Sequence, residues 1–164
     1  SGTGFSAGTG PLVFEIAQLG KVLPLICYEA VFPQDVSHAP SRADVMVQLT
    51  NDAWFGTSIG PEQHLASARM RAVEEGLPIV RAANTGISAI IDANGDLVAR
   101  LGNGETGVID AALPSAHPPT LYARFGDWAL LALIFTTWTV GLAAGLIGTH
   151  RCNKRTRTEK KSCC

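Results

Sequence analysis

The chain has 164 residues, of which 46% are hydrophobic and 16% are charged, and its formal net charge is −1. That small value hides a division: residues 150–164 carry six basic residues against one Glu, whereas residues 1–149 carry seven basic and thirteen acidic residues. Three of the four cysteines (Cys152, Cys163 and Cys164) lie in the basic tail and Cys27 stands alone, which argues against a disulfide framework.

The first half of the chain predicts a loop followed by three strands. Residues 1–10 contain four glycines without periodicity and predict the loop. Apolar runs over 13–19 and 21–27, joined near Gly20, predict two strands, the second buried on both faces, although Pro24 removes one ladder donor. A Val-rich run over 44–50 predicts a core strand that ends at Asn51-Asp52.

The second half predicts one helix and four further strands. Ser58-Ile59-Gly60-Pro61 predicts a helix start, with Leu65, Ala68, Ala72 and Val73 on one face and a stop at Gly76 and Pro78. Strands are expected over 79–83, 87–93, 97–101 and 106–113, with Asn94-Gly95 as a hairpin turn. The whole predicts one α+β domain over 1–113, followed by a Pro-rich and aromatic linker over 114–127.

Residues 128–149 form 22 consecutive positions without a charge, which predicts a transmembrane helix. The basic tail over 150–164 indicates a cytoplasmic carboxyl terminus, with residues 1–127 on the opposite side of the membrane. Nucleic-acid binding by the tail is the competing interpretation, and we disfavour it because the tail adjoins the span. The chain starts at Ser1 without Met or a signal peptide, so we expect it to be the carboxyl-terminal part of a longer membrane protein.

Cys27 is the candidate nucleophile. A lone cysteine is more often an inert core thiol, but Cys27 follows a buried strand and precedes the polar Tyr28 and Glu29. We expect its sulfur at the sheet edge, with the Tyr28 backbone N–H placed to meet an oxyanion on a carbonyl that Cys27 attacks. Asn51-Asp52 is either a strand-ending turn or part of the same site.

Several phrases together resemble the apolipoprotein N-acyltransferase family, membrane-embedded members of the nitrilase superfamily. They are Cys27-Tyr28-Glu29, Thr50-Asn51-Asp52-Ala53-Trp54-Phe55-Gly56, Ser58-Ile59-Gly60-Pro61-Glu62-Gln63-His64, Ala68-Arg69-Met70-Arg71-Ala72 and Tyr122-Ala123-Arg124-Phe125-Gly126-Asp127-Trp128. The ordered set spans most of the chain from about Leu12 to Trp128 and is more specific than any single phrase.

The resemblance implies part of a nitrilase-like αββα sandwich on the periplasmic face of a bacterial inner membrane, followed by one transmembrane helix. It implies a ping-pong acyltransferase that needs no cofactor. A phospholipid donates an acyl chain to Cys27 as a thioester, which passes to the amino terminus of a diacylglyceryl-cysteine apolipoprotein. By the same resemblance, Tyr28 and Glu29 support the site, and Trp54, Phe55 and Asn51 contact substrate.

The resemblance also implies a general-base Glu and an oxyanion-binding Lys upstream of the cysteine, and neither has a match here. Lys21 cannot substitute, because six strand residues place it ~20 Å from Cys27 at the opposite end. A thiol with an ordinary pKa near ~8.5 is only a few per cent thiolate at neutral pH. We therefore expect this chain alone to be inactive.

Other polar residues receive structural interpretations. His38, His64, His117 and His150 have no metal-ligand spacing, so we expect no metal site. We expect His64 to face solvent or cap local backbone. Arg69, Arg71 and Arg81 are expected on solvated surfaces, with phosphate head-group pairing as the alternative. Two rival functions remain, a membrane-tethered nitrilase-type amidase and an inactive membrane-anchored scaffold.

Overall fold

The computed structural model describes residues 8, 10–37, 39–56 and 58–159, with side chains described up to residue 143. The chain forms two compact units, Ser1–Arg124 and Phe125–Cys164. The first unit contains all the described strands and is the part of the molecule that carries the candidate site. The second contains the long helix α4, Trp128–Glu159.

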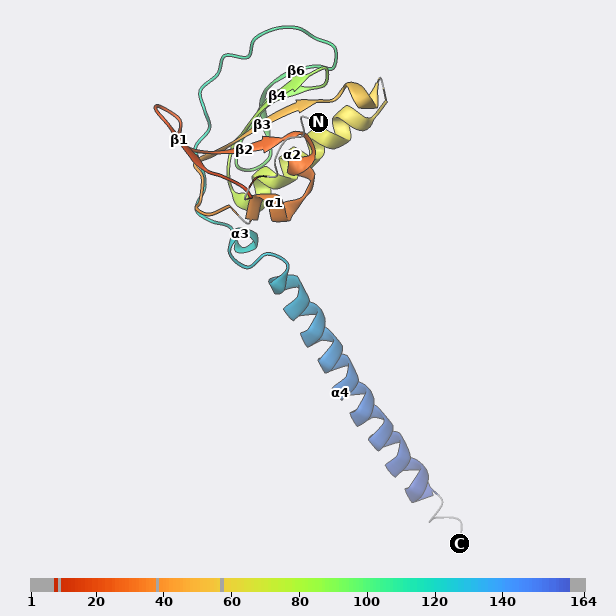
Figure 1. Ribbon diagram of the computed structural model, residues 1–164. Helices are drawn as coiled ribbons and strands as arrows, with labels where there is room; N and C mark the ends of the chain where they lie inside the picture. The colour runs from red at the N-terminus through yellow and green to blue at the C-terminus, as the bar shows by residue number, and fades with distance from the viewer. Residues whose placement is uncertain (1–7, 9, 38, 57, 160–164) are drawn as a thin grey trace, which may run out of the picture. The chain divides into compact units, whose positions relative to one another are not determined.

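The first unit is built on one six-stranded sheet with strands in sequence order (Figure 1). The strands are β1 (Phe14–Ile16), β2 (Gly20–Ile26), β3 (Val45–Asn51), β4 (Ile79–Asn84), β5 (Ser88–Ile91) and β6 (Leu97–Leu101). Strands β2, β3 and β4 are parallel, and the other neighbours pair antiparallel. Because parallel strands end at one edge, the residues that follow β2, β3 and β4 are brought together there.

The connections between the parallel strands contain the described helices of the first unit other than α3. A short 3₁₀ helix η1 (Cys27–Val31) and α1 (Pro33–Ser37) join β2 to β3, and η2 (Ala53–Phe55) precedes α2 (Gly60–Glu75). Helix α2 lies along one face of the sheet (Figure 1) and buries Leu65, Ala68 and Ala72 against it. A further short helix, α3 (Leu121–Phe125), follows the extended segment after β6.

The two faces of the sheet differ in what covers them. Leu25 pairs with Gln48 on the face that α2 covers, and both side chains are fully buried. Ile26 and its pairing partner Leu49 alternate to the opposite face, where they are 53% and 48% exposed. Large apolar side chains on this second face, Phe14 among them, are therefore left open to solvent.

Most predicted elements are confirmed, with shifted ends. Residues 97–101 form the predicted strand, and the hairpin turn at Asn94-Gly95 places Gly95 at φ +80°. The α2 helix ends where Gly76 adopts the left-handed conformation that terminates helices. Val73, expected on the buried face, is half exposed.

One predicted strand is wrong. Residues 106–113 form no strand, and Val108 within them is 90% exposed. A pattern of apolar residues is not enough to make a strand. The segment must also lie beside the edge of another strand, whose backbone supplies its hydrogen-bond partners.

The predicted membrane span falls within α4. Its side chains beyond residue 143, together with the whole of the predicted basic tail and its three cysteines, lie outside the described side chains. Within the part that is described, no helix combines the length and hydropathy that a bilayer crossing requires. The span over 128–149 therefore remains a prediction.

Candidate functional site

Cys27 lies at a sharp bend between β2 and η1. It adopts φ +53°, in the left-handed region that residues other than glycine rarely occupy. The preceding residue, Ile26, is still extended, so the chain reverses its twist at the cysteine itself. The Cys27 side chain is a free thiol and is partly exposed at the carboxyl end of β2. Backbone strain of this kind concentrates at functional sites.

Glu29 closes the bend from inside the chain. Its Oε2 accepts a hydrogen bond of 2.6 Å from the backbone N–H of Ile26. Ile26 is the residue before η1, and this bond from the side chain three positions on is one half of a capping box. The carboxylate is thus used to hold the backbone on one side of Cys27, which fits a supporting role more closely than one in proton transfer.

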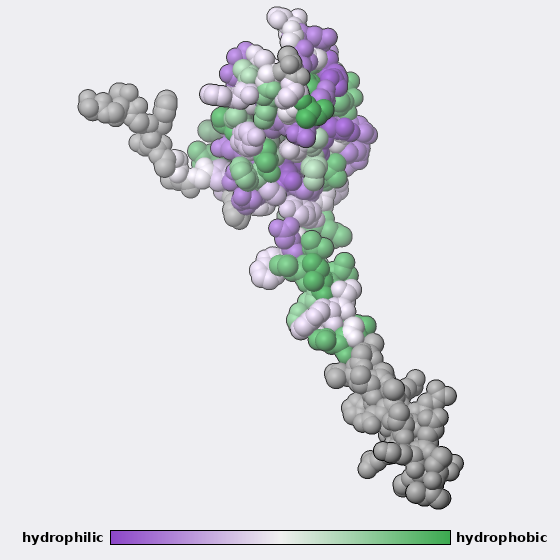
Figure 2. Space-filling view, turned by 90° about the vertical axis from the view of Figure 1, so that its right-hand side faces the viewer, coloured by the Kyte–Doolittle hydropathy of each residue, from purple (hydrophilic) through white to green (hydrophobic). Residues whose placement is uncertain are grey.

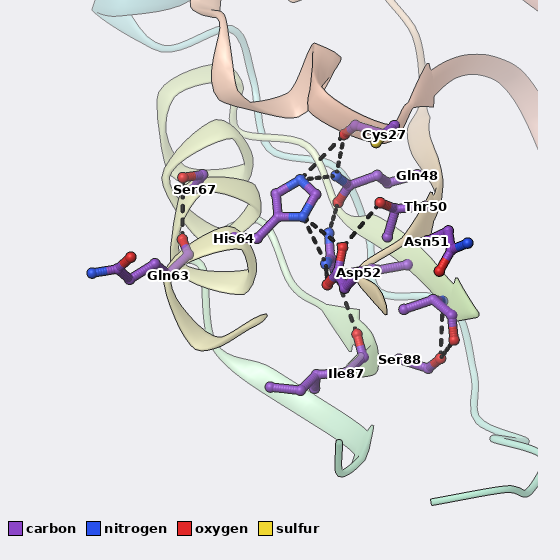
Figure 3. A network of polar contacts seen from close by, with 12 residues as sticks. Cys27, Gln48, Thr50, Asn51, Asp52, Gln63, His64, Ser67, Ile87 and Ser88 are labelled. Carbon is purple, nitrogen blue, oxygen red and sulfur yellow. Dashed lines mark hydrogen bonds and ion pairs between the residues drawn. The ribbon is translucent and has the colours of Figure 1, made fainter. Parts of the chain in front are cut away.

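The backbone carbonyl of Cys27 is turned inward, toward α2 and β3. The Nε2 atom of Gln48, on β3, donates to this oxygen over 3.0 Å. The Nε2 atom of His64, on α2, lies 3.2 Å from the same oxygen and 3.2 Å from Gln48 Nε2 (Figure 3). One backbone atom of the bend therefore lies within hydrogen-bonding distance of two side chains from two different elements.

Behind these contacts lies a buried ion-paired cluster. Asp52 accepts hydrogen bonds from His64 Nδ1 at 2.8 Å, from Arg81 Nη2 at 2.6 Å and from Thr50 Oγ1 at 3.1 Å. The side chains of Asp52 and Arg81 are completely shielded from solvent, and that of His64 nearly so. We call the group formed by Gln48, Asp52, His64 and Arg81 the polar cluster.

Arg81 ties the cluster together from β4. Its Nη1 donates to Gln48 Oε1 over 2.5 Å, and its Nε donates to the Ile87 carbonyl over 3.0 Å. Because Arg81 holds the amide oxygen of Gln48, the amide nitrogen must face Cys27. Burial lowers the pKa of the Arg81 guanidinium, and the Asp52 carboxylate opposes that shift. A buried cation is tolerated here because it is paired with Asp52 and each of its three nitrogens donates a hydrogen bond.

The turn over residues 84–86 packs closely against Asp52. The Asp52 N–H donates to the carbonyls of Asn84 and Thr85, and Thr85 itself adopts φ +52°. An added Cβ at Gly86 would lie 2.7 Å from Asp52 Cβ and Oδ2. Gly86 also adopts φ +127°, so both space and backbone conformation require glycine there.

Two aromatic rings, those of Tyr28 and of the predicted substrate-contacting Phe55, pack against the His64 imidazole of the cluster. The Tyr28 ring stacks on His64 at 5.5 Å, and Phe55 meets the same imidazole edge-on at 5.9 Å. Trp54 is 87% exposed on the adjoining turn. Asn51 caps that turn, its Oδ1 accepting from the Ala53 N–H at 3.1 Å. The structure thus brings Cys27, Tyr28, Glu29, Phe55 and the Asn51 turn to one sheet edge.

Three structural interpretations of polar residues are wrong. His64 does not face solvent or cap local backbone, because α2 directs it onto β3 and the bend. Arg81 is 2% exposed, since it occupies an inward position on β4 directly opposite Gln48. Arg71 is also buried, and it pairs with Glu74 one helical turn on. Only Arg69 is exposed as expected.

The sequence carried a signal for this cluster that periodicity does not capture. Gln48 interrupts the run of 45–49, and Arg81 interrupts that of 79–83, each in an otherwise apolar strand. A polar side chain in a buried strand needs a partner, so two such strands predict a pair.

The arrangement presents a thiol outward and a fixed carbonyl inward, at an edge lined by aromatic rings. Among the described residues, no three potential ligands gather as a metal site. The carboxylate of Glu29, two positions after Cys27, is engaged with the Ile26 N–H. The geometry suits nucleophilic attack on a carbonyl compound, with a base supplied from outside the described contacts.

Comparison with known proteins gives consistent results. Residues 4–117 match the family model of carbon-nitrogen hydrolases. Over 131 residues, 80% of this chain, the sequence is 55% identical to apolipoprotein N-acyltransferase of Bradyrhizobium diazoefficiens and 51% identical to that of Rhodopseudomonas palustris. The chain spans about a quarter of the length of these curated relatives, 24% of each.

Solved structures agree on the fold. A carbon-nitrogen hydrolase from Helicobacter pylori G27 superimposes with a TM-score of 0.55 at 13% identity, over 62% of this chain and 43% of that one. An amidase from Nesterenkonia sp. AN1, with acrylamide added at its active-site cysteine, gives a TM-score of 0.52 at 20% identity. That alignment covers 82% of this chain and 51% of the amidase, and at such identities the likeness shows the fold alone.

Proposed function

This chain belongs to the carbon-nitrogen hydrolase family, and from that premise we propose that it carries the nucleophile of an apolipoprotein N-acyltransferase. Identity of 55% and 51% to curated enzymes of that name supports the proposal over 80% of the chain. The single observation that carries it is Cys27 itself, a partly exposed thiol at φ +53° where β2 ends.

The proposed reaction has two half-reactions. A base takes the proton of the Cys27 thiol, and the thiolate attacks an ester carbonyl of a phospholipid. The S–C bond forms and the ester C–O bond breaks. The lysophospholipid leaves as an alkoxide, which takes up the proton that the thiol had lost. The amino terminus of a diacylglyceryl-cysteine apolipoprotein then attacks the thioester. The C–N bond forms, the C–S bond breaks, and the proton lost by the amine returns to the thiol.

Each residue near Cys27 has a proposed part in this reaction. The Tyr28 backbone N–H donates to the oxyanion that forms in both half-reactions, and Glu29 holds the bend through Ile26. The exposed Trp54 and the half-buried Phe55 contact the acyl chain, and Asn51 fixes the turn that presents them.

The general base and a Lys that binds the oxyanion come from residues outside this chain. Glu29 does not replace the base, because its carboxylate already accepts from the Ile26 N–H. A thiol that has no positioned base to take its proton is a weak nucleophile. We therefore expect the 164-residue chain to take up no acyl chain when supplied with phospholipid alone.

Domain organisation and membrane placement are part of the same proposal. Residues 1–113 are the carboxyl part of the hydrolase-like domain, 114–127 the linker, 128–149 a membrane span and 150–164 a cytoplasmic tail. Support comes from the uncharged run over 128–149 and from the described part of α4, whose apolar side chains Leu133, Ile134 and Phe135 are more than half exposed. Figure 2 shows hydrophobic residues gathered along this part of the helix. The enzyme domain would then lie on the periplasmic side of a bacterial inner membrane.

Replacing the sulfur tests the function. In cells whose only copy of the gene encodes Cys27→Ser, with whatever sequence precedes Ser1 retained, lipoproteins should accumulate with a free amino terminus. Mass spectrometry of a lipoprotein's first peptide measures this directly. Normal N-acylation in the Cys27→Ser strain, at equal protein abundance, would refute the proposal and favour the scaffold.

A further inference from the structure

The polar cluster suggests a specific task beyond stability, and this inference rests on the proposed function. Gln48 and His64 both contact the carbonyl oxygen of Cys27, not its side chain. Neither contact is needed to bury the thiol, which remains partly exposed. What they fix is the plane of the peptide that joins Cys27 to Tyr28.

A trans peptide is planar, and its C=O and N–H bonds point in opposite directions. Holding the Cys27 oxygen inward therefore directs the Tyr28 N–H outward, to the side from which a substrate carbonyl approaches. Tyr28 is the second residue of η1, so its N–H lies in the first turn, where N–H groups have no intrahelical acceptor. It is available to an incoming oxyanion.

We propose that Gln48, His64, Asp52 and Arg81 are positioning residues that set the oxyanion donor of the acyl-transfer site by anchoring the Cys27 carbonyl. Gln48 is the direct anchor, and Arg81 fixes the direction of its amide through the 2.5 Å bond to Oε1. Asp52 binds both Arg81 and His64, so one buried carboxylate orients both arms of the cluster.

The tautomer of His64 is consistent with this task. Its Nδ1–H donates to Asp52 Oδ1, which leaves Nε2 facing Gln48 and the Cys27 oxygen. Neutral His64 accepts the second N–H of the Gln48 amide at Nε2. Protonated His64 donates from Nε2 to the Cys27 oxygen. In both states Gln48 keeps its own bond to that oxygen.

Two reactions of the Cys27 sulfur distinguish a misplaced oxyanion donor from a general disturbance of the site. Acylation of Cys27 by a p-nitrophenyl ester develops an oxyanion, and the S–C bond forms as p-nitrophenolate leaves. Alkylation by iodoacetamide displaces iodide at a saturated carbon and develops no oxyanion. Only acylation should respond to the direction of the Tyr28 N–H, whereas both reactions respond to thiol exposure and ionisation.

The main test compares Gln48→Met with Gln63→Met in the gene product as the cell makes it. Methionine matches the length of glutamine but cannot donate, and Gln63 is an exposed residue of α2 outside the polar cluster. Gln48→Met should lower the single-turnover acylation rate by about 10²-fold, the cost of a misplaced or lost oxyanion donor. Its alkylation rate should equal that of Gln63→Met, with both rates read from the mass of the Cys27 peptide.

The outcomes are distinct. Acylation of Gln48→Met at the Gln63→Met rate, or an equal fall in acylation and alkylation, overturns the positioning role alone. Failure of the unsubstituted protein to take up acyl chains from the ester and from phospholipid overturns the proposed function, and this inference with it.

A second pair decides the matter if Gln48→Met does not fold. His64→Gln places an amide near the Nε2 position and loses the Asp52 bond, whereas His64→Asn keeps an amide near Nδ1 and loses the end that faces Cys27. Acylation should fall further in His64→Asn than in His64→Gln, with alkylation alike in both. Equal or reversed acylation losses overturn the inference.

Discussion

Replacement of Asp52 by Asn should destabilise the first unit by several kcal/mol. Asp52 is 1% exposed and its carboxylate accepts from Thr50, His64 and Arg81, so its loss leaves the guanidinium of Arg81 buried without a counter-charge. Breaking a buried pair from one side costs about 3–5 kcal/mol. Arg81 keeps the neutral acceptors Gln48 and Ile87, which places the expected loss near the lower limit, about 3 kcal/mol.

Urea unfolding of the 164-residue chain, followed by circular dichroism, measures this loss. With a slope of about 2 kcal/mol per M, the midpoint should fall by about 1.5 M. Asp96→Asn is the matched control, because Asp96 is exposed in the β5–β6 turn. The double variant Asp52→Asn/Arg81→Met should lose about 1–3 kcal/mol less unfolding free energy than the sum of the losses in the two single variants. A midpoint for Asp52→Asn equal to that of Asp96→Asn would refute the idea that a buried ion pair holds this sheet edge.

Two further predictions concern the same unit. Gly86→Ala should lower stability by about 1–3 kcal/mol relative to Gly104→Ala in the urea assay. A Cβ at Gly86, at φ +127°, meets Asp52 at 2.7 Å, whereas Gly104, at φ +79°, faces open space. Equal losses would show that Asp52 can move freely. Burial raises the pKa of Glu75 above its ordinary value of 4.5, against the opposing charge of Arg42. A group whose pKa is raised in the folded state contributes stability below its unfolded-state pKa, and this contribution is lost as pH rises through its folded-state pKa. Glu75→Gln should therefore raise the Tm near neutral pH, and this gain should vanish toward pH 4.5. A Tm difference that stays constant with pH would contradict the burial effect.

The sequence predicted local elements well, because their signals are local. The stop of α2 at Gly76, the turn at Asn94-Gly95 and the strand over 97–101 each depend on residues within a few positions of one another. The failed strand over 106–113 has an apolar pattern but no partner edge, and a partner is a property of the whole sheet.

The candidate site was predicted in part for the same reason. Cys27, Tyr28 and Glu29 are adjacent in sequence, so their shared place at a strand end could be inferred. His64 and Arg81 lie 37 and 54 positions beyond Cys27. His64 reaches the bend, and Arg81 reaches Gln48 beside it, only because α2 connects β3 to β4 in parallel register. Such register places Gln48 opposite Arg81, and no periodicity within a single segment encodes it.

The mass of the Cys27 peptide, after brief exposure of the gene product to phospholipid vesicles, tests the central claim most directly. The account predicts a gain of one acyl chain on Cys27 that hydroxylamine removes, as expected of a thioester, and that disappears when a diacylglyceryl-cysteine peptide is added. An unmodified Cys27 that releases free fatty acid would indicate an amidase-type hydrolysis. An unmodified Cys27 with no release, in a protein that still matures lipoproteins, would contradict the account.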